Sequence, residues 1–148
     1  MRNVVLKPFK AAKDAGVLTF MSGFNDLNGV PATGNEFILK QILRKEWGFQ
    51  GMVVSDWSSI SEMISHGFCA NEKEAAYKAL TAGVDMEMSS FTYAGNLKTL
   101  LKEGKIDQKL VDDAVRNILR VKFKLGLFEN PYVNPEAQKQ VLNPAFLD

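Results

Sequence analysis

The run Gly51-Met52-Val53-Val54-Ser55-Asp56-Trp57 is a short apolar stretch that ends in a carboxylate followed by an indole. Its apolar residues do not alternate with polar ones, which predicts a strand buried on both faces. Side chains at the carboxyl end of a parallel strand face the functional crevice of an α/β protein. Asp56 is therefore a candidate for chemistry. The alternative is that Asp56 caps the next helix, because Asp is a favoured N-cap residue.

Two other apolar runs, at 17–21 and 84–88, predict further strands. Between the strands, apolar residues recur at spacings of three and four, which predicts helices. Residues 22–34 are rich in Gly, Asn, Asp and Pro and are predicted to form a long loop. The expected helices are 4–15, one that is capped by Thr33 or Asn35 and reaches Trp47, 60–64, one from Asn71 to Gly83, one around Leu97–Leu101 that ends at Gly104, and the longest from Asp107 to Gly126.

This alternation of strands and helices predicts an α/β fold made of right-handed βαβ units around a parallel sheet. Three strands are too few to close a barrel, since a (β/α)₈ barrel needs eight strands and typically about 250 residues. The chain is therefore either a small open α/β domain or the last part of a TIM barrel.

Composition restricts the class of protein further. The 148 residues suffice for one ordinary domain, and the net charge of +1 implies no strong attraction to nucleic acid or to an anionic membrane. A single cysteine, Cys69, excludes an internal disulfide framework and a site built from several cysteines. No segment reaches the roughly 20 apolar residues of a membrane helix, and the start of the chain does not resemble a signal peptide.

Few residues remain that could carry chemistry. No glycine-rich phosphate loop follows a strand, and no G-x-S-x-G elbow is present. The only histidine, His66, and the scattered carboxylates lack the spacing of metal ligands, so neither a metal nor a cofactor is implied. Asp56 lies at the carboxyl end of a predicted strand. Asp85 lies near the start of another, where a structural hydrogen bond is the expected role.

Apolar side chains near these strand ends could form a pocket around Asp56. Trp57 offers a flat face of the kind that stacks on sugar rings. Met21 closes the first strand and could floor a pocket, although methionine is more often plain core.

Four motifs in order resemble glycoside hydrolase family 3. The sequence MSGFNDLNGVPA at 21–32 is similar to a loop motif of that family. The sequence at 43–57, LRKEWGFQG followed by MVVSDW, resembles its nucleophile signature. AGVDMEM at 82–88 resembles its next strand, and RVKFKLGLFENPY at 120–132 resembles the close of its barrel domain. The resemblance runs from about Val4 to Tyr132, and it is nearest to bacterial β-glucosidases of the periplasmic type.

The resemblance implies a retaining glycosidase that acts on a β-glucoside or oligosaccharide. The aspartate nucleophile of the family corresponds to Asp56, and the tryptophan after it to Trp57, a wall for the leaving-group sugar. Phe24 is a further substrate-binding candidate, at a position where many members have Tyr. A periplasmic or secreted parent protein is also implied, although the chain itself indicates no compartment.

Relative to the family, residues 1–132 are expected to form the C-terminal part of the N-terminal barrel domain, and 133–148 a linker or tail. The earlier barrel strands and the second domain with its acid/base glutamate would then be missing. The chain is expected to be inactive alone and to self-associate through exposed barrel edges.

Three other interpretations stay open at this point. The first is a β-xylosidase. The second is a β-N-acetylglucosaminidase, which the Ser55-Asp56-Trp57 sequence disfavours because those relatives tend to have Ser-Asp-Asp there. The third is a non-catalytic α/β module that binds carbohydrate or another protein.

Overall fold

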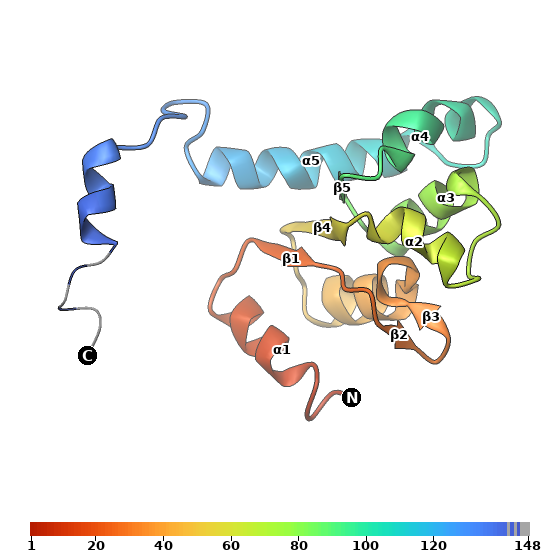
Figure 1. Cartoon of the computed structure of the whole chain (residues 1–148), viewed down its shortest axis with the longest axis horizontal. Helices are drawn as coiled ribbons and strands as arrows, with labels where there is room; N and C mark the ends of the chain where they lie inside the picture. The colour runs from red at the N-terminus through yellow and green to blue at the C-terminus, as the bar shows by residue number, and fades with distance from the viewer. Residues whose placement is uncertain (142, 144, 146–148) are drawn as a thin grey trace.

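The chain forms an α/β structure with a three-stranded parallel sheet (Figure 1). The computed structural model describes residues 1–141, 143 and 145. Its elements are α1 (Lys7–Asp14), β1 (Thr19–Met21), β2 (Asp26–Leu27), β3 (Val30–Pro31), η1 (Ala32–Gly34), η2 (Phe37–Glu46), β4 (Met52–Trp57), α2 (Ser59–Ser65), α3 (Glu72–Ala82), β5 (Met86–Met88), α4 (Thr92–Lys102), α5 (Gln108–Lys124) and η3 (Pro135–Gln140).

The three predicted strands are confirmed, with β4 at the centre of the order β1-β4-β5. Strand β4 extends through Trp57, so Asp56 and Trp57 belong to the strand itself. The outer strands are shorter than the predicted ranges of 17–21 and 84–88. The carbonyl of Leu18 still accepts a hydrogen bond from the amide of Met52, at 3.0 Å.

The prediction of a long loop over residues 22–34 is wrong. The segment folds into the antiparallel hairpin β2–β3 followed by the 3₁₀ helix η1. Asn28 and Gly29 form the two-residue turn, with φ of 54° and 76°. Asn-Gly is the preferred pair for a type I′ hairpin turn, because both residues tolerate positive φ. Thr33 anchors the segment, since its buried hydroxyl lies 2.9 Å from the hydroxyls of both Ser22 and Ser59.

Most helix boundaries follow the predicted signals. The side chain of Asn71 accepts from the amide of Glu74 at 3.0 Å, and Gly83, at φ 108°, closes α3. Asn35 caps the helix before β4, where its side chain accepts from the amide of Ile38 at 3.1 Å. The helix at 4–15 is shorter than predicted, because it begins at Lys7. Helix η2 is a π-helix, which the apolar spacing did not predict.

One face of the sheet is covered by helices and the other is open. Val53 and Val84 are fully buried against the helices, together with alanines of α3. On the opposite face, Met21 pairs in register with Val54, which pairs with Met86. Met21 and Met86 are 50% and 43% exposed. A parallel sheet with helices on one side only is the arrangement of part of a TIM barrel.

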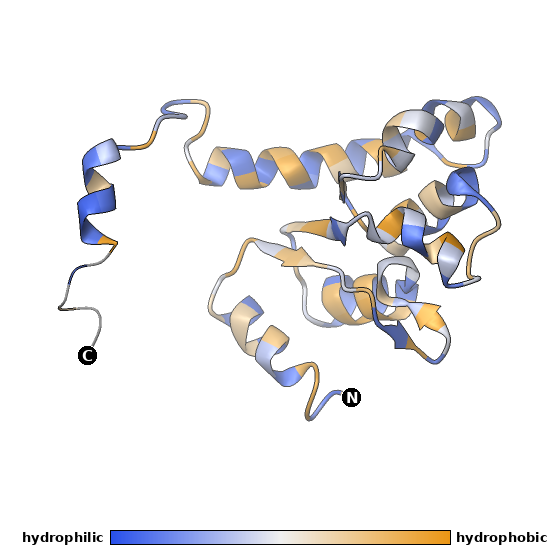
Figure 2. Ribbon diagram, in the orientation of Figure 1, coloured by the Kyte–Doolittle hydropathy of each residue, from blue (hydrophilic) through white to orange (hydrophobic). Residues whose placement is uncertain are grey.

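The C-terminal part of the chain leaves this body along α5 (Figures 1 and 2). Apolar and polar residues alternate along the free length of α5, and η3 lies apart from the sheet. The residues of η3 are exposed and mostly polar. Of the predicted tail at 133–148, residues 142, 144 and 146–148 lie outside the described part of the chain.

Candidate active site

Asp56 lies at the carboxyl end of the central strand, on the open face of the sheet. Along β4, Val53 and Ser55 are buried toward the helices, whereas Val54 and Asp56 lie on the other face and are partly exposed. The Oδ1 atom of Asp56 accepts a hydrogen bond from the backbone amide of Trp57, at 2.6 Å. Among the described residues, no other hydrogen bond of the Asp56 carboxylate is present. The carboxylate is thus positioned by its own backbone and remains available.

The alternative role of Asp56, as the N-cap of the next helix, is wrong. Helix α2 begins at Ser59, and the residue before it is Ser58. Ser58 adopts the left-handed conformation, with φ 55°, and its side chain makes no capping bond. The chain therefore turns sharply after Trp57, whose side chain is 65% exposed.

The other sequence-predicted site residues lie near the same region. Met21, the last residue of β1, lies on the open face one strand away from β4, as its register with Val54 shows. Phe24 lies in the segment between β1 and the hairpin and is 39% exposed. Met88, the last residue of β5, pairs in register with Trp57. Met21 and Asp56 thus share one face of the sheet, while Trp57 is exposed at the end of β4 and Phe24 is exposed in the segment after β1.

Asp85 occupies the opposite end of the sheet, and its predicted structural role is confirmed. Its carboxylate accepts from the Arg44 guanidinium at 2.5 Å, the Val53 amide at 2.7 Å and the Asn117 side chain at 2.9 Å. Burial raises the pKa of the Asp85 carboxyl, against the opposing charge of Arg44. Arg44 also donates to the carbonyl of Gly51 at 2.5 Å. These bonds tie η2, β4 and α5 to the start of β5.

Glu87 anchors the start of α4, a role that the sequence analysis did not assign. Its carboxylate accepts from the backbone amides of Thr92 at 2.5 Å and Tyr93 at 2.8 Å, and from the hydroxyl of Ser90. A carboxylate is favoured at this place, since the amides of a first helical turn are otherwise unpaired. The sequence does show a glutamate five residues before the first residue of α4, at Thr92. That spacing matches no standard capping motif, so the role was not predicted.

His66 and Cys69 are both at the far end of α2 from Asp56. The Nδ1 atom of His66 lies 3.1 Å from Oδ1 of Asp26, which joins the end of α2 to the hairpin. Cys69 is buried as expected for a small apolar side chain, and burial raises the pKa of its thiol. Neither side chain belongs to the site around Asp56.

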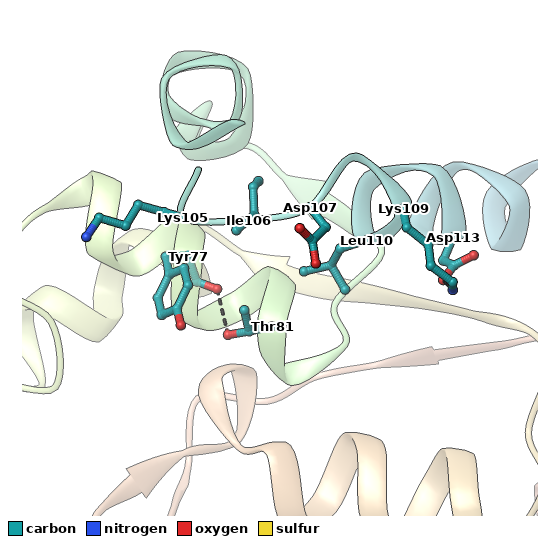
Figure 3. Close-up of a pocket in the computed structure, with 8 residues that line it drawn as sticks. All are labelled: Tyr77, Thr81, Lys105, Ile106, Asp107, Lys109, Leu110 and Asp113. Atoms are coloured by element: carbon teal, nitrogen blue, oxygen red, sulfur yellow. Dashed lines mark hydrogen bonds and ion pairs between the residues drawn. The ribbon is translucent and has the colours of Figure 1, made fainter. Parts of the chain in front are cut away.

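The described part of the chain contains at least two pockets. The larger, of about 470 Å³, is mainly apolar and lies between α1, β1, the hairpin and η2, with Met21 in its wall. The smaller, of about 280 Å³, lies between α3 and the start of α5 and is lined by groups such as Tyr77, Lys105 and Asp113 (Figure 3). This smaller pocket is lined by none of the strand residues. Within the described ranges, no cluster of His, Cys, Asp and Glu side chains is arranged to hold a metal ion.

Comparison with known proteins identifies the family. Residues 1–121 match the Glycosyl hydrolase family 3 N terminal domain. The chain is 46% identical over 130 residues to a periplasmic beta-glucosidase of Salmonella typhimurium, and 43% identical over 139 residues to a beta-xylosidase of Formosa agariphila. These alignments cover 88% and 87% of the chain. The chain therefore belongs to glycoside hydrolase family 3.

Solved structures agree with this assignment. The crystal structure of a beta-glucosidase from Listeria innocua superimposes with a TM-score of 0.90 at 41% identity, over 95% of this chain. A mutant of that enzyme in complex with laminaribiose superimposes with a TM-score of 0.89. The fold is accordingly part of the barrel of a family 3 N-terminal domain.

The chain spans only about a fifth of the length of these relatives. It covers 17% of the Salmonella protein, 19% of the Formosa protein and 20% of the Listeria chain. Among the described residues, no helix combines the length and the apolar character that crossing a membrane requires.

Proposed function

We propose that this chain contributes the nucleophile to a β-glucosidase that removes terminal non-reducing β-D-glucosyl residues with retention of configuration. The observation that carries the proposal is the placement of Asp56. Its carboxylate lies at the carboxyl end of the central strand, on the open face, where active sites of barrel enzymes form. The match to beta-glucosidases at 41–46% identity supports glucosides as substrates.

The proposed reaction is a double displacement. An oxygen of the Asp56 carboxylate attacks the anomeric carbon, and the bond from that carbon to the leaving oxygen breaks with its electron pair. An acid elsewhere in the complete enzyme protonates the leaving oxygen. The same group then removes a proton from water, which attacks the anomeric carbon and releases Asp56 as carboxylate.

Trp57, Met21 and Phe24 are proposed to shape the sugar site around this carboxylate. Trp57 presents an exposed indole next to Asp56, which suits stacking against the leaving-group sugar. Met21 lies on the same face of the sheet as Asp56 and would contact the bound glucosyl ring. Phe24 is partly exposed and would border the ring from the segment after β1.

Hydrolysis with retention requires a second carboxyl group about 5–5.5 Å from the nucleophile. We assign this role to none of the described carboxylates, because Asp85 before β5 and Glu87 in β5 are held in structural hydrogen bonds. The proposal is therefore that residues 1–132 belong to the barrel domain, that 133–148 lead toward a further domain, and that the complete enzyme is periplasmic or secreted. The 148-residue chain alone would be inactive.

The isolated chain is also proposed to self-associate. Strands β1 and β5 are the outer strands of the sheet, so each leaves one row of backbone groups unpaired. The exposed methionines on the open face add apolar surface. Size-exclusion chromatography with an aryl β-glucoside assay tests both statements. A sharp monomer that turns over substrate, and loses that turnover on Asp56→Asn, would contradict them.

The deciding experiment on the nucleophile uses the complete enzyme that contains these residues. Asp56→Asn should lower turnover of an activated aryl β-glucoside by about 10⁴-fold or more, since the amide cannot form the ester, while the fold persists. A parallel assay with an aryl β-xyloside would separate the glucosidase proposal from the xylosidase alternative. Near-normal turnover by Asp56→Asn would refute the assignment. Sugar binding without turnover by the parent enzyme would favour a non-catalytic binding module.

A further inference from the structure

The pairing between β4 and β5 contains an irregularity at the proposed nucleophile. Val54 pairs with Met86, and Trp57 pairs with Met88. Three steps along β4 therefore correspond to two steps along β5, which places one extra residue of β4 at Ser55–Asp56. On the other side, β4 pairs with β1 in regular register from Met52 to Val54. The irregularity is thus a β-bulge that begins at Ser55, and bulges of this kind re-aim the side chains that they carry.

The side chain of Ser55 holds this bulge closed. The backbone amide of Met88, whose residue pairs with Trp57 at the far side of the bulge, donates to Oγ of Ser55 at 2.8 Å. The Ser55 hydroxyl in turn donates to the carbonyl of Asp56 at 2.9 Å. Ser55 is fully buried, so water does not compete for either bond. A hydroxyl serves both bonds because it accepts and donates at once.

The peptide bond between Asp56 and Trp57 is consequently held on both edges. Its carbonyl accepts from Ser55, and its amide donates to Oδ1 of Asp56 at 2.6 Å. The plane of this peptide fixes the direction of the Asp56 side chain as well as the direction in which the chain leaves toward Trp57. The second carboxylate oxygen, Oδ2, takes part in no hydrogen bond among the described residues.

We propose that Ser55 is a positioning residue for the nucleophile: its hydroxyl fixes the Asp56–Trp57 peptide and so directs Oδ2 of Asp56 at the anomeric carbon. This inference rests on the proposed function of Asp56. A purely structural role, in which Ser55 only satisfies the amide of Met88, would affect folding but not the rate of the folded enzyme. The two roles are therefore separable by experiment.

The test uses the complete enzyme that contains these residues, with a 2,4-dinitrophenyl glucoside as substrate. Dinitrophenolate leaves with its electron pair and needs no proton, so the first step reports on attack by Asp56 alone. The concentration of folded sites is counted by trapping the glycosyl-enzyme with the 2-deoxy-2-fluoro analogue. Ser55→Ala should lower the first-step rate per folded site by about 10- to 100-fold with little change in KM, because a displacement of about 1 Å at a reacting group costs on that order.

Ser59→Ala is the matched control, because it removes a second buried serine hydroxyl that bonds to Thr33 and not to the Asp56–Trp57 peptide. Its rate per folded site should stay within about twofold of the parent. Ser55→Cys retains a weak donor and a weak acceptor, so its rate should lie between those of the parent and Ser55→Ala. It replaces Ser55→Ala in the test if that variant does not accumulate as folded protein.

The outcomes separate the positioning role from the proposed function itself. Equal rates per folded site for the parent and the Ser55 variant, with Asp56→Asn inactive, would overturn the positioning role and leave the nucleophile in place. An active Asp56→Asn variant would overturn the proposed function instead.

Discussion

The two ends of the parallel sheet treat an aspartate in opposite ways. At the amino end, Asp85 is buried and accepts from the guanidinium of Arg44, the amide of Val53 and the side chain of Asn117. At the carboxyl end, Asp56 is partly exposed and bonds only to the amide of its own neighbour, Trp57, among the described residues. An aspartate carboxylate is thus held in structural hydrogen bonds at the amino end and left accessible at the carboxyl end.

The backbone repeats this contrast. At the carboxyl end, Ser58, Ser89 and Phe91 all have positive φ, of 55°, 72° and 56°. Non-glycine residues in this region are strained and gather at functional sites. At the amino end, Arg44 donates to the backbone carbonyls of Phe49 and Gly51, and Asp85 accepts from the backbone amide of Val53. We infer that the amino end of the sheet maintains stability, whereas the carboxyl end trades stability for an open and directed surface.

The largest expected effect is at the amino end. Asp85→Ala should lower the free energy of unfolding by about 3–5 kcal/mol, because Arg44 loses its partner and the amide of Val53 is left unpaired. Burial raises the pKa of the Asp85 carboxyl, which means that desolvation offsets part of its attraction to Arg44. The loss of stability therefore comes mainly from leaving Arg44 and the Val53 amide without a partner. Urea unfolding of the complete enzyme that contains these residues, followed by circular dichroism, measures the change.

Glu103→Ala is the control for this variant. It breaks an ion pair with Lys73 in which both side chains are about 40% exposed, and should change the unfolding free energy by at most about 1 kcal/mol. If Asp85→Ala costs no more than Glu103→Ala, the amino end is not the stabilising end of the sheet.

A smaller effect is expected at Trp57, on substrate and not on stability. In the complete enzyme, Trp57→Ala should lower kcat/KM for a disaccharide by about five- to tenfold more than for an aryl glucoside with a small leaving group. Loss of one aromatic stacking contact, worth about 1 kcal/mol, gives this ratio. The unfolding free energy should stay within about 0.5 kcal/mol, since the side chain is 65% exposed.

Tyr132→Ala is the matched control, an exposed aromatic (84%) far along the chain from the sheet. It should leave both substrates unaffected. An equal loss of kcat/KM for disaccharide and aryl glucoside in Trp57→Ala would identify a structural tryptophan. The carboxyl end of the sheet would then not contact the leaving-group sugar through Trp57.

The sequence predicted the elements of this fold better than their local geometry. The three parallel strands, the cap at Asn71 and the structural role of Asp85 all follow from apolar runs, capping residues and position along a strand. The hairpin was missed although Asn28-Gly29 is a strong turn signal, because the surrounding polar residues suggested a loop. The signal was therefore present in the sequence.

Other features could not be read from one segment. The bulge at Ser55 depends on how β4 pairs with β5, which is a property of two strands together. The bonds of Glu87 depend on the tight turn between β5 and α4. At the candidate site, the sequence thus predicted the position of Asp56 but not the hydrogen bonds that direct its carboxylate.

The smallest expected effect tests the strain at the carboxyl end directly. Ser58 has φ 55° and no side-chain capping bond, so its left-handed backbone costs about 1–2 kcal/mol for an L-residue. Glycine removes that cost but gains freedom in the unfolded chain, worth roughly 0.5–1 kcal/mol. Ser58→Gly should therefore raise the unfolding free energy by up to about 1 kcal/mol.

Three residues later, Ser61→Gly should have the opposite sign. Ser61 lies inside α2, and its hydroxyl donates to the carbonyl of Ser58 at 2.9 Å, so glycine should lower the unfolding free energy by about 0.5 kcal/mol or more. Urea unfolding of the two variants side by side gives the comparison. Destabilisation by both would show that Ser58 is not strained. In the complete enzyme, a stabilised Ser58→Gly with reduced turnover would show that the strained turn helps to hold Asp56 and Trp57 in place.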